Sequence, residues 1–163
     1  ITQKRLIEVL HYSPETGVFT WARSAGRAKA GNVAGAPHNM GYIQITIDYK
    51  NHLAHRVAWL YMTGDWPENQ IDHINHIRND NRWVNLRDVN GQENLKNQLM
   101  RTDNTSGVVG VSWYGRSKKW TSQINIDGQN KYLGRFADKF EAICCRKSAE
   151  NKHGYHENHG AQK

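Results

Sequence analysis

One stretch, residues 71–94, constrains this chain more than any other. It opens with Asp72 and His73 at the end of a short apolar run, passes through an Asn-rich loop to a second short run, and ends in a helix-like segment that carries Asn94. Carboxylate and amide oxygens are ligands that hard cations such as Mg²⁺ prefer. A neighbouring imidazole can take up a proton near neutral pH. The stretch therefore predicts strand, loop, strand and helix around a site that combines a metal ion with a base.

This stretch resembles the HNH endonuclease motif in the form found in phage and intron-encoded homing endonucleases. The likeness extends back to residues 54–58, Ala-His-Arg-Val-Ala, which precede the motif in that family. An isolated Asp-His pair would more simply be a strand end running into a turn, but the spacing from residue 54 to residue 94 favours the motif. The resemblance implies a nuclease domain over residues 1–100, with a ββα-metal (His-Me finger) core at about 70–100.

The resemblance also implies the role of each site residue. Asp72 and Asn94 would bind Mg²⁺ or Mn²⁺, His73 would deprotonate the attacking water, and Asn85 would brace the loop. Asn94 stands where many relatives have a final histidine, so the motif is an HNN variant. His76 takes a position that is often glycine in relatives.

Hydrolysis of double-stranded DNA to 5′-phosphate and 3′-hydroxyl ends by one-metal chemistry is the activity that this family implies. A single site per chain would nick DNA, whereas a homodimer could cut both strands. A DNA-binding regulator whose HNH module is only structural is the alternative from another class, and an RNA-directed nuclease has little support in the sequence.

Several basic residues near the motif are candidates for DNA contact. His55 and Arg56 begin a predicted helix at 54–63, and in the family this histidine lies close to the active site and the DNA. A core histidine with a backbone partner is the alternative for His55. The arginines predicted either to clamp phosphates or to be ordinary surface are Arg78, Arg82 and Arg87.

The charge distribution indicates where DNA would be held. The chain has 22 Lys and Arg against 15 Asp and Glu, a net charge of +7, as is typical of polyanion binders. Residues 1–50 carry +3, residues 51–100 carry −1 and residues 101–163 carry +5. The flanks would therefore grip phosphates while the centre holds the metal.

The C-terminal third has its own pattern. After a polar linker at 101–106, strands are predicted at 108–114, 118–126 and 131–136, followed by a helix from residue 138. Residues 107–160 resemble the plant ethylene-response-factor (Apetala-type) DNA-binding domain, whose sheet lies in the major groove. In that family arginines flank a Gly-Val pair in the first strand, and at these positions the present chain has Val109 and Ser112. The residues predicted to contact DNA are Trp113, Arg116, Lys119, Gln123, Asn125 and Arg135, although Trp113 could equally be core, as Trp120 and Phe136 are expected to be.

The N-terminal region is predicted to support the nuclease core. A helix at 2–11, a hairpin at 12–21, a basic loop at 22–41 and a half-buried strand at 42–48 are expected, with a second strand following a turn at 50–51. The loop could follow the DNA backbone or simply be solvated. The motif residues expected to pack against this region are Trp83, Val84, Leu86, Leu95 and Leu99.

The predicted fold class is thus α+β: an HNH module with preceding strands and helix, then a three-stranded antiparallel sheet packed on a helix. The only cysteines are the adjacent Cys144 and Cys145, which support neither a disulfide framework nor a zinc ribbon. No membrane span or signal peptide is visible, so the expected location is the cytoplasm of an infected bacterial host. The histidines of the tail, 153–159, are expected to be flexible and to bind metal only adventitiously.

Overall fold

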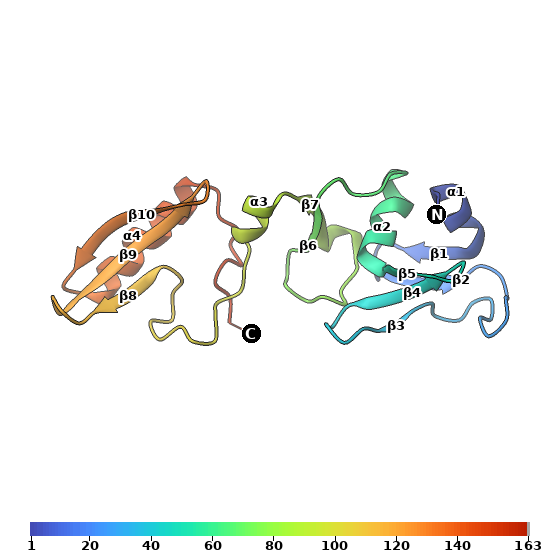
Figure 1. Cartoon of the computed structure of the whole chain (residues 1–163), viewed down its shortest axis with the longest axis horizontal. Helices are drawn as coiled ribbons and strands as arrows, with labels where there is room; N and C mark the ends of the chain where they lie inside the picture. Colours follow the sequence, from blue (N-terminus) through green and yellow to red (C-terminus); the bar gives the residue numbers. More distant parts are fainter. Residues whose placement is uncertain (163) are drawn as a thin grey trace. The chain divides into compact units, whose positions relative to one another are not determined.

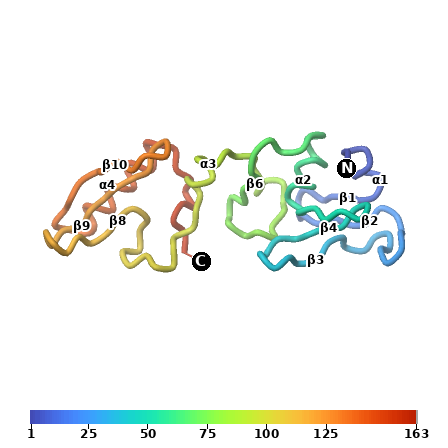
Figure 2. Tube along the Cα trace, viewed as in Figure 1, coloured from blue at the N-terminus to red at the C-terminus, as the bar shows by residue number. Residues whose placement is uncertain are grey.

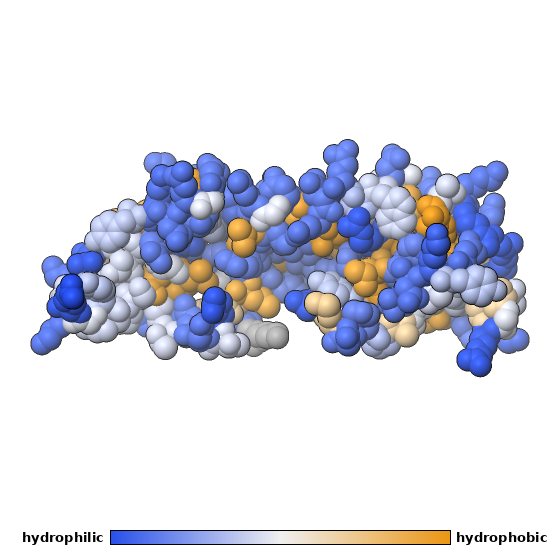
Figure 3. All heavy atoms as spheres, in the orientation of Figure 1, coloured by the Kyte–Doolittle hydropathy of each residue, from blue (hydrophilic) through white to orange (hydrophobic). Residues whose placement is uncertain are grey.

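The computed structural model describes residues 1–162, which form two compact units, Ile1–Asn90 and a second unit that begins at Gly91 (Figure 1). The predicted domain boundary at residue 100 lies inside the second unit. Both units mix short helices with small antiparallel sheets, so the predicted α+β class is confirmed. The face visible in Figure 3 is mostly hydrophilic, with hydrophobic residues only in small patches. None of the helices in the described residues is long and apolar enough to cross a membrane.

The first unit contains three small sheets and two α-helices. The sheets pair β1 with β2, β3 with β4 and β5, and β6 with β7, all antiparallel. In chain order its elements are α1 (Gln3–Val9), β1 (Leu10–Ser13), β2 (Val18–Trp21), β3 (Ala36–Pro37), β4 (Ile43–Ile47), β5 (Lys50–Leu53), α2 (Ala54–Thr63), β6 (Gln70–His73), the 3₁₀ helix η1 (Trp83–Asn85) and β7 (Leu86–Val89).

Local sequence signals explain the ends of the helices. Thr2 caps α1 by accepting a hydrogen bond from the Arg5 backbone N–H at 3.3 Å, and Gly64 ends α2 in the left-handed conformation, with φ of 92°. The two helices pack with the sheets around one core. Its fully buried members include Leu6, Leu10, Phe19, Ile45, Val57, Ala58 and Leu60.

The predicted turn at residues 50–51 is two residues too late. Strand β4 alternates as expected, with Ile45 and Ile47 buried, but Ile47 pairs directly with Lys50 and the two loop residues are Asp48 and Tyr49. Both loop residues have positive φ, 48° and 63°, although neither is the Asn or Gly that such turns usually contain.

The predicted packing of the motif residues is correct for Leu86 and wrong for Val84 and Leu95. Leu86 is 7% exposed and belongs to the core of the first unit, whereas Val84 is 80% exposed. The tight 3₁₀ turn of η1 points successive side chains in different directions, so Asn85 is buried and Val84 faces solvent. Leu95 lies in the second unit and is 52% exposed.

The second unit is a three-stranded antiparallel sheet with one long helix. Its elements are α3 (Gly91–Leu95), β8 (Val111–Tyr114), β9 (Lys119–Ile126), β10 (Gln129–Phe136) and α4 (Lys139–Lys152), and the sheet order is β10-β9-β8. The hairpin turn between β9 and β10 is formed by Asp127 and Gly128, with φ of 51° and 78°. Helix α4 packs on β9 and β10. The expected helical segment that carries Asn94 is present as α3 and ends at Leu95.

The C-terminal tail is ordered rather than flexible. It lies beside residues 96–100, with backbone hydrogen bonds from His156 to Lys96, from Gly160 to Gln98 and from Met100 to Ala161 (Figure 2). His159 is 3% exposed, and its Nε2 lies 3.3 Å from a guanidinium nitrogen of Arg146. The tail is therefore part of the fold of the second unit.

Arg146 shows that α4 does not present a purely apolar face to the sheet. It is 2% exposed, donates to Glu150 at 2.8 Å and donates to the backbone carbonyl of Gln123 at 2.7 Å. Phe140, an apolar residue near the start of this helix, is 70% exposed. Buried charge can be tolerated here because each partner is hydrogen-bonded.

Replacing Gly17 by alanine is expected to lower the free energy of unfolding of the first unit by about 2–4 kcal/mol. Its φ is 73°, and an added Cβ would lie 2.4 Å from the backbone nitrogen of Arg82. Gly26→Ala is the matched control, because Gly26 also has positive φ but open space around it. Urea unfolding followed by tryptophan fluorescence would measure both variants. Equal losses for the two would contradict the proposed close contact.

Candidate active site

Strands β6 and β7 bring the acidic residue and the histidine of the motif into one place. In their register Asp72 pairs with Arg87, and His73 pairs with Leu86. Successive strand residues point to opposite faces, which would separate the two side chains. His73 is the last residue of β6, and the chain turns at once, with the His76 N–H donating to the His73 carbonyl at 2.9 Å. Regular strand geometry therefore ends at His73, and the rule that successive side chains point to opposite faces no longer applies beyond it.

Asp72 is braced by an arginine from the neighbouring strand. Arg87 donates from Nε at 3.0 Å and from Nη2 at 2.7 Å, and both bonds end on Oδ2 of Asp72. The Asp72 side chain is only 11% exposed and that of Arg87 is 28% exposed. Arg87, predicted as a possible phosphate clamp, thus acts in this structure on the Asp72 carboxylate.

Asn81 holds the ring of His73. The ring Nε2 lies 3.3 Å from Oδ1 of Asn81, and the amide nitrogen of Asn81 donates to the Asn79 carbonyl. Because an amide oxygen only accepts, this contact favours a ring proton on Nε2. Burial lowers the pKa of His73, although the hydrogen bond with Asn81 and the charges of Asp72 and Asp80 oppose the shift. The ring is consequently in the neutral form that a base requires.

Two further rings lie against His73. The His55 ring is 5.1 Å away and nearly perpendicular, at 83°, and the Tyr42 ring is 5.9 Å away. His55 is 5% exposed, and among the described residues its buried Nδ1 has no hydrogen-bond partner. Because His55 is buried, it is better placed to support the His73 ring than to contact DNA directly. The burial agrees with the alternative of a core histidine, but among the described residues no backbone group bonds to its Nδ1.

The loop between β6 and β7 is held together by its own polar side chains. Asn85 accepts from the Asn75 backbone N–H at 2.9 Å and donates to the Asp80 carbonyl at 2.7 Å. Asn75 in turn donates its amide hydrogen to the Asp80 carboxylate at 2.6 Å. His76 has φ of 63°, the left-handed region that favours glycine, which fits the frequent glycine at this position in relatives.

The N-terminal hairpin fixes the same loop from outside. The Tyr12 hydroxyl donates to the Asn81 carbonyl at 2.6 Å, and the Trp83 N–H donates to the Pro14 carbonyl at 2.9 Å. Tyr12 is 8% exposed, and burial raises the pKa of its hydroxyl, so it remains a donor. Since Asn81 also contacts His73, the hairpin and the histidine are joined through one residue.

The remaining arginines predicted to contact DNA also have protein partners. Arg56 donates to the backbone carbonyls of Asn69 and Pro67. Arg78 donates to the Met40 carbonyl at 2.9 Å and lies over the Tyr42 ring at 5.2 Å. Arg82 pairs with Asp80 and thereby lowers the pKa of that carboxyl to about 2.

The donor set suits a hard cation better than zinc. Among residues 1–162, no three His, Cys, Asp or Glu side chains are grouped so that they could hold a metal ion. Mg²⁺ usually keeps several waters and binds through one or two carboxylates together with substrate phosphates. The Asp72 carboxylate, braced through one oxygen, fits this mode of binding. Asn94, the other predicted ligand, lies on α3 in the second unit, and its role stays a prediction.

The sheet of the second unit has one side covered by α4 and one side open. Val111, Ser122 and Ile124 are buried on the side of the sheet that α4 covers. Strand alternation places on the opposite side the residues that we call the open face, namely Ser112, Tyr114, Lys119, Thr121, Gln123, Asn125, Asn130, Tyr132 and Arg135.

Of the predicted DNA contacts on the strands, strand alternation places Trp113 alone on the side that α4 covers. Trp113 pairs with Trp120, which shares the covered side with Ser122, and their rings lie 5.3 Å apart. Lys119, Gln123 and Arg135 lie on the open face, with the Arg135 guanidinium over the Tyr114 ring at 4.3 Å. Asn125 accepts from the Gly128 N–H at 3.0 Å and so stabilises the hairpin turn. Arg116 is exposed in the turn between β8 and β9.

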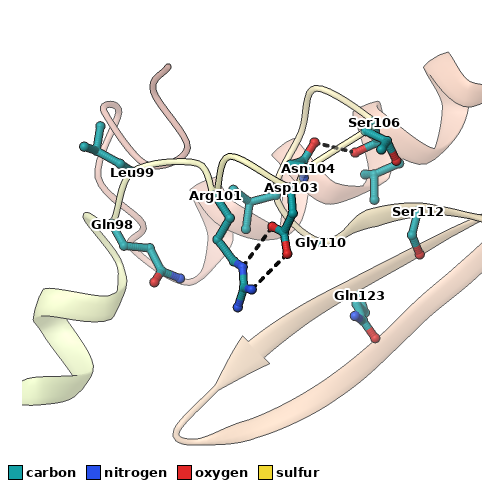
Figure 4. A pocket seen from close by; sticks show the side chains of 12 residues that line it. Gln98, Leu99, Arg101, Asp103, Asn104, Ser106, Gly110, Ser112 and Gln123 are labelled. Atoms are coloured by element: carbon teal, nitrogen blue, oxygen red, sulfur yellow. Dashed lines mark hydrogen bonds and ion pairs between the residues drawn. The ribbon is translucent and has the colours of Figure 1, made fainter. Parts of the chain in front are cut away.

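A hollow of about 310 Å³ adjoins the open face (Figure 4). The sheet contributes Ser112 and Gln123 to it, and the segment before β8 contributes Arg101 and Asp103, which are paired at 2.9 Å. Its lining is mostly polar, and it continues the polar character of the open face toward residues 98–106.

Several site residues were missed from the sequence. Asn75, Asp80 and Asn81 contribute as many hydrogen bonds to the site as the predicted Asn85 does, and the density of Asn and Asp from 75 to 85 was the available signal. Tyr114 and Tyr132 on the open face could have been predicted from the alternation of side chains along their strands. Tyr42 carried no local signal, because its contact with His73 joins residues far apart in the chain.

Comparison with known proteins supports a nuclease. Residues 52–96 match the family model described as HNH endonuclease. That range runs from β5 through α2, β6 and β7 into α3, and it includes His55, Asp72, His73, Asn85 and Asn94. No curated protein and no solved structure matches the chain.

His55 is expected to make the stability of the first unit depend on pH. Burial, with smaller contributions from the charges of His73 and Arg56, lowers its pKa to about 3, against about 6.5 in the unfolded chain. Between these values the unfolded state binds more protons, so the free energy of unfolding falls as the pH falls. From pH 7.5 to pH 5.0 this group should account for a loss of about 2 kcal/mol.

Urea unfolding at the two pH values would test this expectation. His55→Leu should reduce the loss by that amount, whereas the control His11→Leu, at an exposed position, should leave it unchanged. A loss of the same size in His55→Leu and in the wild type would contradict the assignment.

Proposed function

We propose that this chain is a metal-dependent endonuclease of the homing type, phage-encoded, that hydrolyses phosphodiester bonds of double-stranded DNA. The observation that carries the proposal is that a buried, neutral His73 held by Asn81 directly follows an arginine-braced Asp72 on β6. Both residues lie within the segment that matches HNH endonucleases.

His73 is the proposed general base. With the ring held by Asn81, the imidazole accepts a proton from the attacking water, and the imidazolium that forms is stabilised by the nearby Asp72 and Asp80 charges. Asn81 keeps the ring in one orientation throughout. The Tyr42 and His55 rings restrict its movement on the other sides.

Asp72 is the proposed metal ligand in the first unit, and Asn94 is proposed as a second oxygen ligand on the strength of the HNH resemblance. When bound, Mg²⁺ or Mn²⁺ supplies positive charge that stabilises the departing 3′ oxygen and the phosphate. Arg87 holds the carboxylate in place by donating to Oδ2. The products are a 5′-phosphate and a 3′-hydroxyl.

The open face of the second unit is the proposed DNA-holding surface. It carries Lys119 and Arg135 for phosphates, with Arg116 in the adjoining turn. Gln123 lies at its centre, where an amide can read base edges in a major groove wide enough for strands. Tyr114 and Tyr132, 38% and 63% exposed, add aromatic contact area.

Incubating supercoiled plasmid with the full chain and Mg²⁺ is expected to yield nicked circles, and chelation by EDTA should stop the reaction. His73→Ala should lower the nicking rate by roughly 10²–10⁴, the usual contribution of a general base. Asp72→Asn and Asn94→Ala should lower it through weaker metal binding, with partial recovery at higher Mg²⁺. Gel electrophoresis over time measures each rate.

His11→Ala, at an exposed position outside the site, is the control and should nick at the wild-type rate. Absence of nicking by the wild type, or equal nicking by His73→Ala, would sink the enzyme assignment. A chain that still binds duplex DNA would then be a DNA-binding regulator with a structural HNH module.

Arg135→Gln is expected to weaken duplex binding roughly tenfold and to reduce the slope of log affinity against log salt by about one, because one phosphate contact is lost. Lys152→Gln, the same charge change at an exposed position of α4, is the control and should change neither quantity. Fluorescence anisotropy with a labelled duplex at several salt concentrations gives the affinity and the salt slope. Equal effects of the two variants would mean that DNA does not bind on the open face.

A further inference from the structure

The tip of the β4–β5 hairpin holds an aromatic side chain in an unusual setting. Tyr49 is 103% exposed, so none of its surface is covered by the rest of the chain. It occupies the second position of a two-residue turn with φ of 63°, a conformation that glycine adopts readily and tyrosine does not. Neither packing nor backbone preference accounts for a tyrosine at this position.

The backbone beneath this side chain is nonetheless firmly fixed. Arg5 of α1 grips the other turn residue, Asp48, with bonds of 2.9 and 2.7 Å to its two carboxylate oxygens. Ile47, just before the turn, is 3% exposed in the core, and Thr46 donates across the hairpin to Asn51 at 2.8 Å. Because the turn is already ordered, a contact made by Tyr49 loses little conformational freedom.

The position of the tip relates it to the candidate active site in the same unit. Tyr42, just before β4, lies beside His73, and Tyr49 follows the far end of that strand. At about 3.3 Å per residue the strand carries the tip roughly 20 Å away. This span corresponds to about six base pairs of duplex. A duplex lying along the hairpin from the active site would therefore meet Tyr49.

The charges around the tip suit a phosphate backbone. Lys50 follows Tyr49 directly, and Arg5 and Arg23 both act on Asp48. The bidentate Arg5 pair offsets the one carboxylate at the tip that would repel phosphate, while Glu8 is engaged by the same arginine. Tyrosine hydroxyl groups and lysines are common donors to DNA phosphates.

We propose that Tyr49, with Lys50, is an anchor for the sugar–phosphate backbone of duplex DNA, placed about six base pairs from the scissile bond. The tip contributes affinity and orientation but reads no sequence. This inference rests on the proposed function for the identity of the partner as duplex DNA. It accounts for a residue whose exposure and backbone conformation both work against stability.

The test measures binding without cleavage, by fluorescence anisotropy of a labelled duplex with the full chain in EDTA. Tyr49→Gly should raise Kd roughly three- to tenfold, the equivalent of about one hydrogen bond with its contact area. It should leave the salt slope unchanged and leave the melting temperature equal or higher, since glycine suits the turn. Lys50→Gln should reduce the salt slope by about one.

Phe140→Ser, at a comparably exposed aromatic on α4, is the matched control and should bind as the wild type does. Wild-type affinity in Tyr49→Gly would overturn the inference, as would a change in self-association with DNA affinity unaltered. If the wild type binds duplex through Tyr49 but fails to nick plasmid, the anchor stands and the endonuclease assignment fails. If the wild type nicks and Tyr49→Gly binds normally, only the anchor fails.

Discussion

The hydrogen bonds of one asparagine, Asn81, join the N-terminal hairpin of the first unit to the histidine of the site. Its side chain meets His73, and its backbone carbonyl accepts from Tyr12 in the N-terminal hairpin. The loop that contains it has no regular structure, so its polar groups must be satisfied by side chains. A histidine held in this way keeps its orientation. A base that takes a proton from water during hydrolysis needs such a fixed orientation.

Local signals predicted much of this unit. The expected helices at 2–11 and 54–63 and the half-buried strand around Ile45 all depend on neighbours in sequence, and each is present, although α1 already ends at Val9. The turn at Asp48–Tyr49 was misplaced because its stabilising partner, Arg5, lies far back in the chain. The Tyr42–His73 contact was missed for the same reason. The motif predicted Asp72, His73 and the loop-bracing Asn85, but not Asn81, which contacts His73.

In the second unit, periodicity predicted the strands but not which side chains face outward. The exact register places Trp113 opposite Trp120 on the covered side and leaves Tyr114 on the open face. A shift of the register by one residue would exchange the two sides. Helix α4 departs further from expectation, because it buries Arg146 and exposes Phe140. A buried guanidinium satisfied by Glu150 and a backbone carbonyl has no signature in a hydrophobic pattern.

The pairing of the C-terminal tail with residues 96–100 has a consequence for the order in which the chain matures. Residues 156–161 supply backbone partners to a segment made about sixty positions earlier, which corresponds to several seconds of synthesis at common rates. The first unit has all its strands once residue 89 has emerged from the ribosome, so it can fold vectorially. The strands of the second unit are complete at residue 136, but residues 96–100 must wait for residues 156–161, and until then this segment is the part that chaperones would encounter.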